Sequence, residues 1–171
     1  MIMVSTVLAL QHPDPTIPIR PVRLTDVEEL HRVCWQDRSQ SAVHRLIART
    51  QQFAVQGRGL GVVVMTAPGS DKLLGYGQLT AWPRCGEISD LYVDDRYRSR
   101  GIGTAMIQYL VRTSRQMLLP AVEIGVALSN PRALALYRRL GFTDDRTVQV
   151  DLGSGTESVR YLMLDVPPLR P

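Results

Sequence analysis

Cysteine, lysine and long apolar runs are all scarce in this chain of 171 residues. The two cysteines, Cys34 and Cys85, lie far apart without CxxC spacing, which argues against a disulfide framework and a zinc site. No apolar run approaches the ~18 residues that a membrane-spanning helix needs. A content of 44% apolar residues argues against intrinsic disorder. We therefore expect a globular protein of the reducing cytoplasm, with no membrane association and no bound metal.

Lys72 is the one lysine among 20 basic residues, and the others are arginines. The net charge of +4 raises nucleic acid as a partner, but the arginines form no continuous stripe, and aromatic residues make up only 6% of the chain. Arg96, Arg98 and Arg100 gather in one short segment, which suits a compact polyanion such as a pyrophosphate better than a duplex. A solvated loop explains three arginines equally well. We expect no nucleic-acid partner.

The length corresponds to one domain with a sizeable core, and no repeat or linker divides the chain. Residues 1–10 are apolar but lack the basic start and the cleavage site of a secretory signal, and four prolines follow within residues 11–21. We expect an N-terminal tail at residues 1–16, a single domain at 17–165 and a C-terminal tail at 166–171.

Hydrophobic periodicity predicts strands and helices in the order β-α-α-β-β-β-α-β-α-β-β. Strands are expected at residues 17–23, 61–66, 72–82, 87–94, 121–128, 148–152 and 159–164, and helices at 25–38, 41–56, 102–117 and 130–141. Thr25 and Glu28 have capping-box spacing at the start of the first helix, and turns are expected at residues 67–71 and 153–155. The apolar run at 121–128 is typical of a buried parallel strand. The pattern predicts an α/β domain with a mixed, strongly twisted sheet.

A glycine-containing loop, residues 98–104, leads from the strand at 87–94 into the next helix. Glycine allows a ligand to approach the backbone closely, and the first turn of a helix presents unpaired amides, so a phosphate is the natural occupant. A dinucleotide-binding fingerprint fits less well, because Met106 stands where its third glycine belongs. A plain glycine turn is the other alternative.

At this point the sequence resembles the GCN5-related N-acetyltransferases, the GNAT family. Residues 98–103 fit the family's Arg/Gln-x-x-Gly-x-Gly/Ala pyrophosphate loop, and residues 91–93 fit the strand that holds the pantetheine arm. Asn130, Ala133 and residues 136–142 match its Asn-x-x-Ala-x-x-x-Tyr-x-x-x-Gly-Phe signature. The resemblance covers residues 17–165, and it departs from the pattern at Ser99, where glycine is common.

The resemblance implies a GNAT-type fold, with about seven strands and four helices, that binds acetyl-CoA as cosubstrate between two strands that part near residues 91–93 and 127–130. The backbone amides of residues 99–104 are then expected to hold the pyrophosphate. The expected cofactor-binding residues are Leu91, Tyr92, Val93, Arg98, Ser99, Arg100, Gly101, Ile102, Gly103, Thr104, Asn130, Ala133 and Tyr137. Asn130 is alternatively a plain helix N-cap.

Two residues are candidates for catalysis. An amine of lysine-like pKa, ~10.4, is mostly protonated at pH 7, so a general base is useful. The resemblance places Glu87 at the position of the family's general base, although a strand-end glutamate is as often an ordinary polar residue. Asp90 is the second candidate, but strand alternation points it to the other face unless a bulge intervenes. Tyr137 is the expected acid for the departing thiolate, with a half-buried packing role as its alternative.

The leading hypothesis is therefore an acetyl-CoA-dependent N-acetyltransferase that acts on a primary amine of a small molecule or a protein. A non-catalytic acyl-CoA-binding or regulatory domain is the alternative, and it needs neither Tyr137 nor a base. The first two helices of this fold shape the acceptor site, which makes residues 35–38, Tyr76, Gln78 and the C-terminal hairpin candidate lining residues. The identity of the acceptor and the formation of a homodimer are left open by the sequence.

Overall fold

The computed structural model describes residues 14, 16–151 and 155–167, which form one seven-stranded sheet with four α-helices and two short 3-10 helices. In chain order the elements are β1 (Ile19–Pro21), the 3-10 helix η1 (Leu24–Asp26), α2 (Val27–Val33), α3 (Gln40–Val55), β2 (Gly59–Met65), β3 (Leu73–Ala81), β4 (Gly86–Val93), the 3-10 helix η2 (Asp95–Tyr97), α4 (Ile102–Gln116), β5 (Ala121–Ala127), α5 (Pro131–Arg139), β6 (Thr143–Asp151) and β7 (Thr156–Asp165). The predicted α/β fold and its order of strands and α-helices are confirmed.

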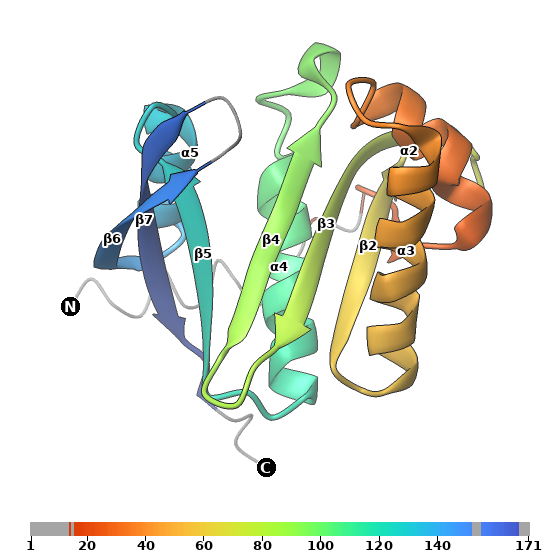
Figure 1. Ribbon diagram of the computed structural model, residues 1–171. Coiled ribbons are helices and arrows are strands. Elements are labelled where there is room, and N and C mark those ends of the chain that lie inside the picture. Colours follow the sequence, from red (N-terminus) through yellow and green to blue (C-terminus); the bar gives the residue numbers. More distant parts are fainter. Residues whose placement is uncertain (1–13, 15, 152–154, 168–171) are drawn as a thin grey trace.

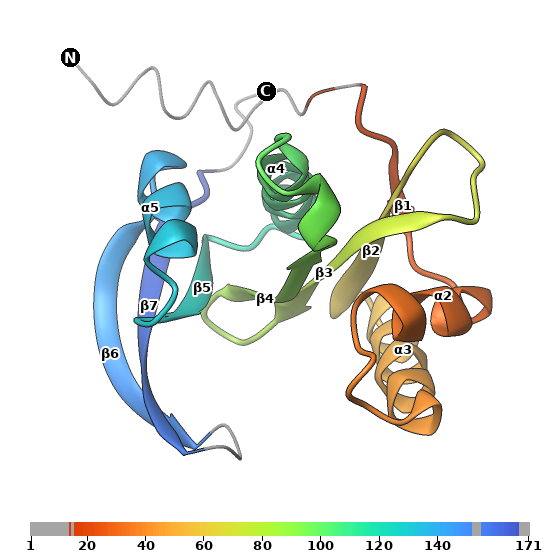
Figure 2. The same cartoon turned by 90° about the horizontal axis from the view of Figure 1, so that it is seen from above.

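The sheet is mixed, with the strand order β1-β2-β3-β4-β5-β7-β6. β4 and β5 are parallel, as the apolar run in β5 predicts, and all the other neighbours are antiparallel. Helices α4 and α5 cover one face of the sheet, and α2 and α3 cover the other (Figures 1 and 2). The parallel pair therefore lies at the junction of an N-terminal half, β1–β4, and a C-terminal half, β5–β7.

Apolar side chains pack on both faces of the sheet. Leu110 of α4 and Ile124 of β5 are buried in the cluster on one face. On the other face, Ile47 of α3 is fully buried in a cluster with Val63 and Tyr76. Fully burying such a side chain contributes about 1.5–3 kcal/mol, so both helical layers hold the sheet in place.

The first predicted helix differs from the structure at its start. The chain makes the 3-10 turn η1 before α2 begins, and the predicted capping box of Thr25 and Glu28 is wrong. Asp26 stabilises this turn instead, because its carboxylate accepts from the Arg23 amide at 2.7 Å and from both terminal nitrogens of Arg20 at 2.7 Å. A paired, buried carboxylate holds this turn better than an exposed hydroxyl does.

The C-terminal hairpin differs from the prediction in length. β6 begins at Thr143 rather than at residue 148, and it pairs with β7 from Thr143 opposite Met163 onward. Its first residues are polar and exposed, because β6 is an edge strand, so the hydrophobic alternation that identifies a strand is missing there. Residues 152–154 of the predicted turn lie outside the described residues.

Most of the two predicted tails, residues 1–13, 15 and 168–171, also lies outside the described residues. Val166, which we assigned to the C-terminal tail, is buried, and its amide donates to the carbonyl of Pro120 at 2.8 Å. Within the described part of the chain, no helix combines the length and the apolar character needed to cross a membrane. The cytoplasmic location stays a prediction.

Candidate active site

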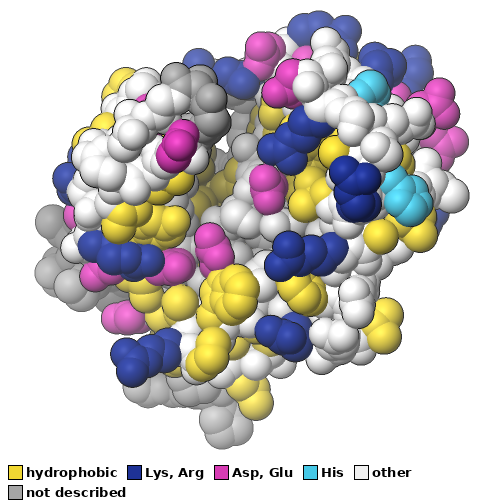
Figure 3. Space-filling view, viewed as in Figure 1, with side chains coloured by type: hydrophobic (Ala, Val, Ile, Leu, Met, Phe, Trp, Pro, Cys, Tyr) yellow, Lys and Arg dark blue, Asp and Glu magenta, His cyan; other side chains and the backbone are white. Residues whose placement is uncertain are grey.

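The two central strands part halfway along their length. β4 and β5 pair only at Gly86 with Val122, Glu87 with Glu123, and Ile88 with Ile124, although β4 continues to Val93 and β5 to Ala127. Beyond these pairs β5 keeps its partner β7, and the two central strands separate toward their carboxyl ends (Figure 1). The space-filling view shows the face hollowed between the two halves of the sheet (Figure 3). Strand edges that face each other across an opening can hydrogen-bond an extended ligand that carries amide groups.

The glycine loop starts α4 at the end of this opening. Gly101 adopts φ 79° at the N-cap, and the first bond of the helix runs from the Ala105 amide to the Gly101 carbonyl. The amides of residues 102–104 therefore point out of the first turn, where a helix has no partner of its own for them. Ser99 also has positive φ, 62°, which explains why glycine is common at this position of the family pattern.

Gly103 tests whether the loop fits an anionic ligand. A Cβ built there meets Leu136 Cδ2 at 3.8 Å and Val93 Cγ2 at 3.9 Å, which are ordinary contacts, so the protein itself has room for a side chain. That Cβ lies between the end of β4 and α5, in the space where a pyrophosphate would approach the helix. The glycine leaves this space clear, so that a compact anion such as a pyrophosphate has room beside the unpaired amides of the first turn.

The clustered arginines divide into two kinds. The carboxylate of Asp94 accepts from the guanidinium of Arg96 at 2.7 Å and from the Arg96 amide at 3.0 Å. Arg96 therefore stabilises the turn that follows β4. Arg98 pairs with a neighbouring carboxylate at 2.5 Å. Arg100 lies over the Tyr97 ring at 5.2 Å and takes part in none of the ion pairs between described residues. Arg96 and Arg98 are thus paired within their own turn, and Arg100 is the member of the cluster without an ion pair among the described residues.

The second motif of the sequence lies across the opening, on α5. Asn130 caps this helix, because its side-chain oxygen accepts from the Ala133 amide at 3.1 Å, and none of the hydrogen bonds between described residues uses its Nδ2 group. Arg132, which the sequence analysis missed, reaches from α5 to the hydroxyl of Ser99 in the glycine loop. The two motifs, more than 30 residues apart in sequence, therefore meet in space.

Tyr137 lies on α5 with its ring packed among apolar side chains. The residue is 7% exposed, and its ring centroid lies 6.3 Å from that of Phe142. Burial raises the pKa of the Tyr137 hydroxyl to about 12, so the group stays protonated at neutral pH. Among the described residues it has no hydrogen-bond partner, which leaves its proton available to a ligand.

A pocket of about 220 Å³ opens on the α3 face of the sheet, beside the predicted catalytic strand. It is lined by Leu46, Arg49, Thr50, Phe53, Gln78, Thr80, Trp82, Glu87, Ser89 and Asp90. Both candidate bases, Glu87 and Asp90, are therefore in one pocket. We call this cavity the acceptor pocket, after the role that the sequence analysis predicts for its two carboxylates.

Asp90 reaches the acceptor pocket because β4 bulges there. The pairing of β3 with β4 shifts register between Tyr76 and Gln78, and Asp90 takes up the extra length with φ 51°. Strand alternation alone points Asp90 to the other face of the sheet, and this bulge brings its side chain to the acceptor pocket. Its carboxylate accepts from Gln78 Nε2 at 2.9 Å, and although the side chain is exposed on one side, desolvation raises its pKa.

Glu87 accepts from the indole nitrogen of Trp82 at 2.8 Å. The side-chain oxygen of Gln78 accepts hydrogen bonds from the hydroxyls of Tyr76 at 2.9 Å and Thr50 at 3.1 Å. These bonds orient the Gln78 side chain so that its amide nitrogen faces Asp90. The buried hydroxyls of Tyr76 and Thr50 therefore fix the position of Asp90 through Gln78. The indole of Trp82 fixes the position of Glu87.

Of the lining residues suggested by the sequence, Gln78 lines the acceptor pocket, whereas Tyr76 is fully buried and contacts two lining residues, Gln78 and Thr50, through its hydroxyl. Trp35 is also buried, with its ring edge-on to Tyr76 at 5.1 Å. The first two helices were expected to shape the acceptor site, but the α3 side chains that line it were missed, because no local pattern says which of them lie over β3 and β4. Alternation along β3 could have found Thr80, two residues after Gln78.

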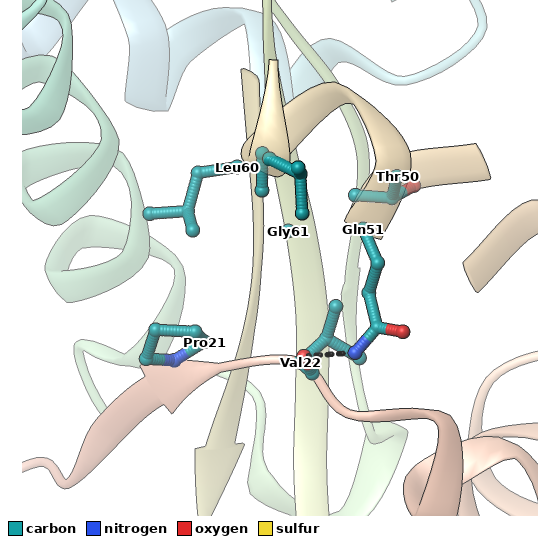
Figure 4. A pocket seen from close by; sticks show the side chains of 8 residues that line it. Pro21, Val22, Thr50, Gln51, Leu60 and Gly61 are labelled. Carbon is teal, nitrogen blue, oxygen red and sulfur yellow. Dashed lines mark hydrogen bonds between the residues drawn. The ribbon is translucent and has the colours of Figure 1, made fainter. Parts of the chain in front are cut away.

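A larger pocket, about 330 Å³, shares Thr50 with the acceptor pocket but contains neither candidate base. Figure 4 shows its lining, in which Gln51 donates to the carbonyl of Val22. The lining residues are Pro21, Val22, Thr50, Gln51, Ala54, Val55, Leu60 and Gly61. This set contains no ionisable side chain, so the pocket offers no group to take a proton from an amine.

Known proteins resemble this chain in sequence and in fold. Residues 24–142 match the model of the acetyltransferase (GNAT) family. An uncharacterized N-acetyltransferase of Methanocaldococcus jannaschii is 36% identical over 63 residues, which are 37% of this chain and 28% of that protein. An N-alpha-acetyltransferase of Sulfurisphaera tokodaii is 30% identical over 87 residues, 50% of this chain and 51% of the relative. The chain thus spans about half or less of the length of these curated relatives.

Solved structures share the fold at low sequence identity. The ribosomal L7/L12 alpha-N-protein acetyltransferase in complex with coenzyme A superimposes with a TM-score of 0.77 at 14% identity, covering 91% of this chain and 97% of that one. The family match includes the glycine loop, both candidate bases and the second motif. The chain belongs to the GNAT family of acetyltransferases.

Proposed function

We propose that the protein transfers the acetyl group of acetyl-CoA to a primary amine by direct attack within a ternary complex. One observation carries the proposal: the opening between the parted strands and the acceptor pocket share β4. Residues 91–93 of this strand border the opening, and Glu87 and Asp90 line the pocket. A single strand thus links a site for a thioester to a site for an amine.

The open strand edges and the glycine loop support acetyl-CoA as the donor. The backbone of residues 91–93 offers hydrogen bonds to the amides of the pantetheine arm, and the amides of residues 102–104 offer them to the pyrophosphate. Arg98 and Arg100 supply positive charge beside the same loop, and Asn130 offers its amide nitrogen from the other side. When bound, acetyl-CoA supplies the activated acyl group.

The acceptor must lose a proton before or during attack. For an amine with pKa ~10.4, deprotonation at pH 7 costs roughly 4–5 kcal/mol, which a carboxylate of raised pKa can help to offset. We assign this role first to Asp90, since desolvation raises its pKa and it lies at the bulge just beyond the point where the strands part. Glu87, three residues earlier and still level with paired β5, is the second candidate and holds the ammonium form of the acceptor.

Tyr137 is proposed to stabilise the departing thiolate. Its pKa of about 12 lies above the ~8.5 of a thiol, so full proton transfer would be uphill by about 5 kcal/mol. A hydrogen bond to the developing negative charge avoids that cost. The carbon–nitrogen bond forms as the carbon–sulfur bond breaks, the amine proton passes to the carboxylate, and the thiolate keeps the tyrosine hydrogen bond until solvent protonates it.

A panel of primary amines with acetyl-CoA, followed by release of free thiol, tests the proposal. We expect turnover with at least one amine, and a fall of about 10²–10⁴ in kcat for Asp90→Asn, against a smaller fall for Glu87→Gln. The reverse order would assign the base to Glu87, and unchanged rates in both variants would exclude a carboxylate base. Tight acetyl-CoA binding without thiol release from any amine would instead favour a non-catalytic acyl-CoA-binding domain.

A further inference from the structure

We infer that the amine acceptor is the amino terminus of a polypeptide whose next residues are acidic, recognised by an arginine rim around the acceptor pocket. The rim consists of Arg38, Arg45, Arg49 and Arg58. This inference rests on the proposed function, because it names the acceptor class of the same site.

The rim gathers on one side of the pocket. α3 carries Arg45 and Arg49 but no acidic residue, and Arg49 lines the pocket itself. Arg38 precedes α3 and lies close enough to Asp90 to act on its charge. All four rim arginines are exposed, and Figure 3 shows Lys and Arg side chains on the half of this face that carries α2 and α3.

The rim arginines lack the carboxylate partners that other arginines of the chain have. None of the ion pairs between described residues includes a rim arginine. Arg49 and Arg58 instead lie over the same ring, that of Phe53, at 5.3 and 5.5 Å. Two guanidinium groups held on one ring repel each other, and an anion beside them relieves that repulsion.

The site therefore carries opposite charges side by side. Glu87 and Asp90 in the lining of the pocket attract an ammonium group, and the rim arginines, of which Arg49 also belongs to that lining, attract anions. A polyamine that placed one cation in the pocket would hold its other cations against the rim, which costs binding energy. An amine followed by carboxylates satisfies both regions.

The size of the pocket favours a peptide over a small amino acid. About 220 Å³ accommodates little more than a terminal residue, so further residues must leave the pocket across the rim. An extended chain advances ~3.3 Å per residue, and Arg45 and Arg49 stand one helical turn apart, ~6 Å, so two acidic residues that are two positions apart and share one face of the peptide can reach both. An α-amine has pKa ~7.7–8.0, and about one molecule in ten is already neutral at pH 7, which suits a carboxylate base.

The test compares fluorescent amidated heptapeptides that share their first residue, contain no lysine and carry Glu, Gln or Arg at the next positions. Fluorescence anisotropy with saturating CoA measures binding, and thiol release from acetyl-CoA measures turnover of the unlabelled forms. We expect affinity in the order Glu, Gln, Arg, with about tenfold or more between the extremes, and loss of this order at high salt.

Arg49→Gln combined with Arg58→Gln should reduce the Glu-to-Gln affinity ratio by about two- to fivefold per arginine, the range of one exposed ion pair. Arg112→Gln is the matched control, because this exposed arginine lies on α4, on the other face of the sheet, and should leave the ratio unchanged. Melting temperatures of all variants check that they are folded.

Equal or tighter binding of the Arg peptide, or an unchanged ratio in the double variant, overturns the inference. Turnover of basic peptides or spermine above that of the Glu peptide also overturns it, while leaving the proposed acetyl transfer intact. Selective binding of the Glu peptide without thiol release supports the arginine rim and instead contradicts the proposed function. The two failures are therefore distinguishable.

Discussion

Replacing Gly103 by aspartate or asparagine separates the role of the loop in ligand binding from its role in the fold. The nearest atoms to a built Cβ lie at 3.8 and 3.9 Å, and no positive φ accompanies Gly103, so either side chain fits without strain. Glycine inside a helix is ~0.8–1 kcal/mol less favourable than alanine, and a carboxylate in the first turn gains ~0.3–1 kcal/mol from the helix dipole. Gly103→Asp should therefore leave the protein at least as stable as the wild type.

The same change should weaken acetyl-CoA binding. A carboxylate ~4 Å from a phosphate costs about 4 kcal/mol per pair of charges at the effective dielectric of a protein surface, before screening by salt. Even a third of that is about tenfold in the dissociation constant. Gly103→Asn has nearly the same shape without the charge, so it measures the steric part alone.

Calorimetry with acetyl-CoA and thermal unfolding without it provide the measurements. We expect acetyl-CoA to bind most tightly to the wild type, less tightly to Gly103→Asn and least tightly to Gly103→Asp. In a chain of this size a loss of about 1 kcal/mol lowers the melting temperature by a few degrees, and we expect no such fall in either variant. A Gly103→Asp variant that binds acetyl-CoA as the wild type does would refute the assignment of the loop.

Three further predictions follow from the site. Tyr137→Phe keeps the buried ring and removes the hydroxyl, so kcat should fall by about tenfold or more while acetyl-CoA affinity changes little; an unchanged kcat would dismiss the hydrogen bond to the thiolate. Asp90→Asn should raise the melting temperature at pH 7 and lower turnover. The raised pKa means that the folded protein keeps a proton on Asp90 at higher pH than the unfolded chain does. The contribution of Asp90 to the free energy of unfolding therefore falls as pH rises from the unfolded pKa through the folded one. The gain in melting temperature should vanish below pH ~3.8, where the carboxyl is protonated in both states, and a gain that persists there would assign it to another cause. Acetyl-CoA at a hundredfold excess over its dissociation constant should stabilise the protein by about 2.7 kcal/mol; a shift with NAD alone would support a dinucleotide site instead.

The sequence predicted those parts of the fold whose signal is local. The apolar run of β5 and the glycine after the arginine cluster identify their elements within a residue or two, because burial and capping act on neighbouring residues. β6 was recognised only in its second half, since an exposed edge strand needs no alternation. Asp26 replaced the expected cap because its partner Arg20 comes from β1.

The candidate site likewise has parts that local sequence predicts and parts that distant residues determine. Motifs located the loop and the second helix, but the bulge at Asp90 is set by the register between β3 and β4, which no window of sequence contains. The presence of Arg49 and Phe53 in the acceptor pocket depends on how α3 packs over the sheet. Tertiary placement, rather than residue type, therefore decides which carboxylate is better placed as a base.

Direct detection of the acetylated product is the most decisive measurement, because free thiol alone could also come from hydrolysis of the thioester. Acetyl-CoA with an isotope-labelled acetyl group is incubated with the protein and the acidic heptapeptide, and mass spectrometry follows the label. The account predicts labelled acetyl on the peptide α-amine, formed in step with free thiol and greatly reduced in Gly103→Asp. Label found only as free acetate, or no transfer to any amine of the panel despite tight acetyl-CoA binding, would contradict it.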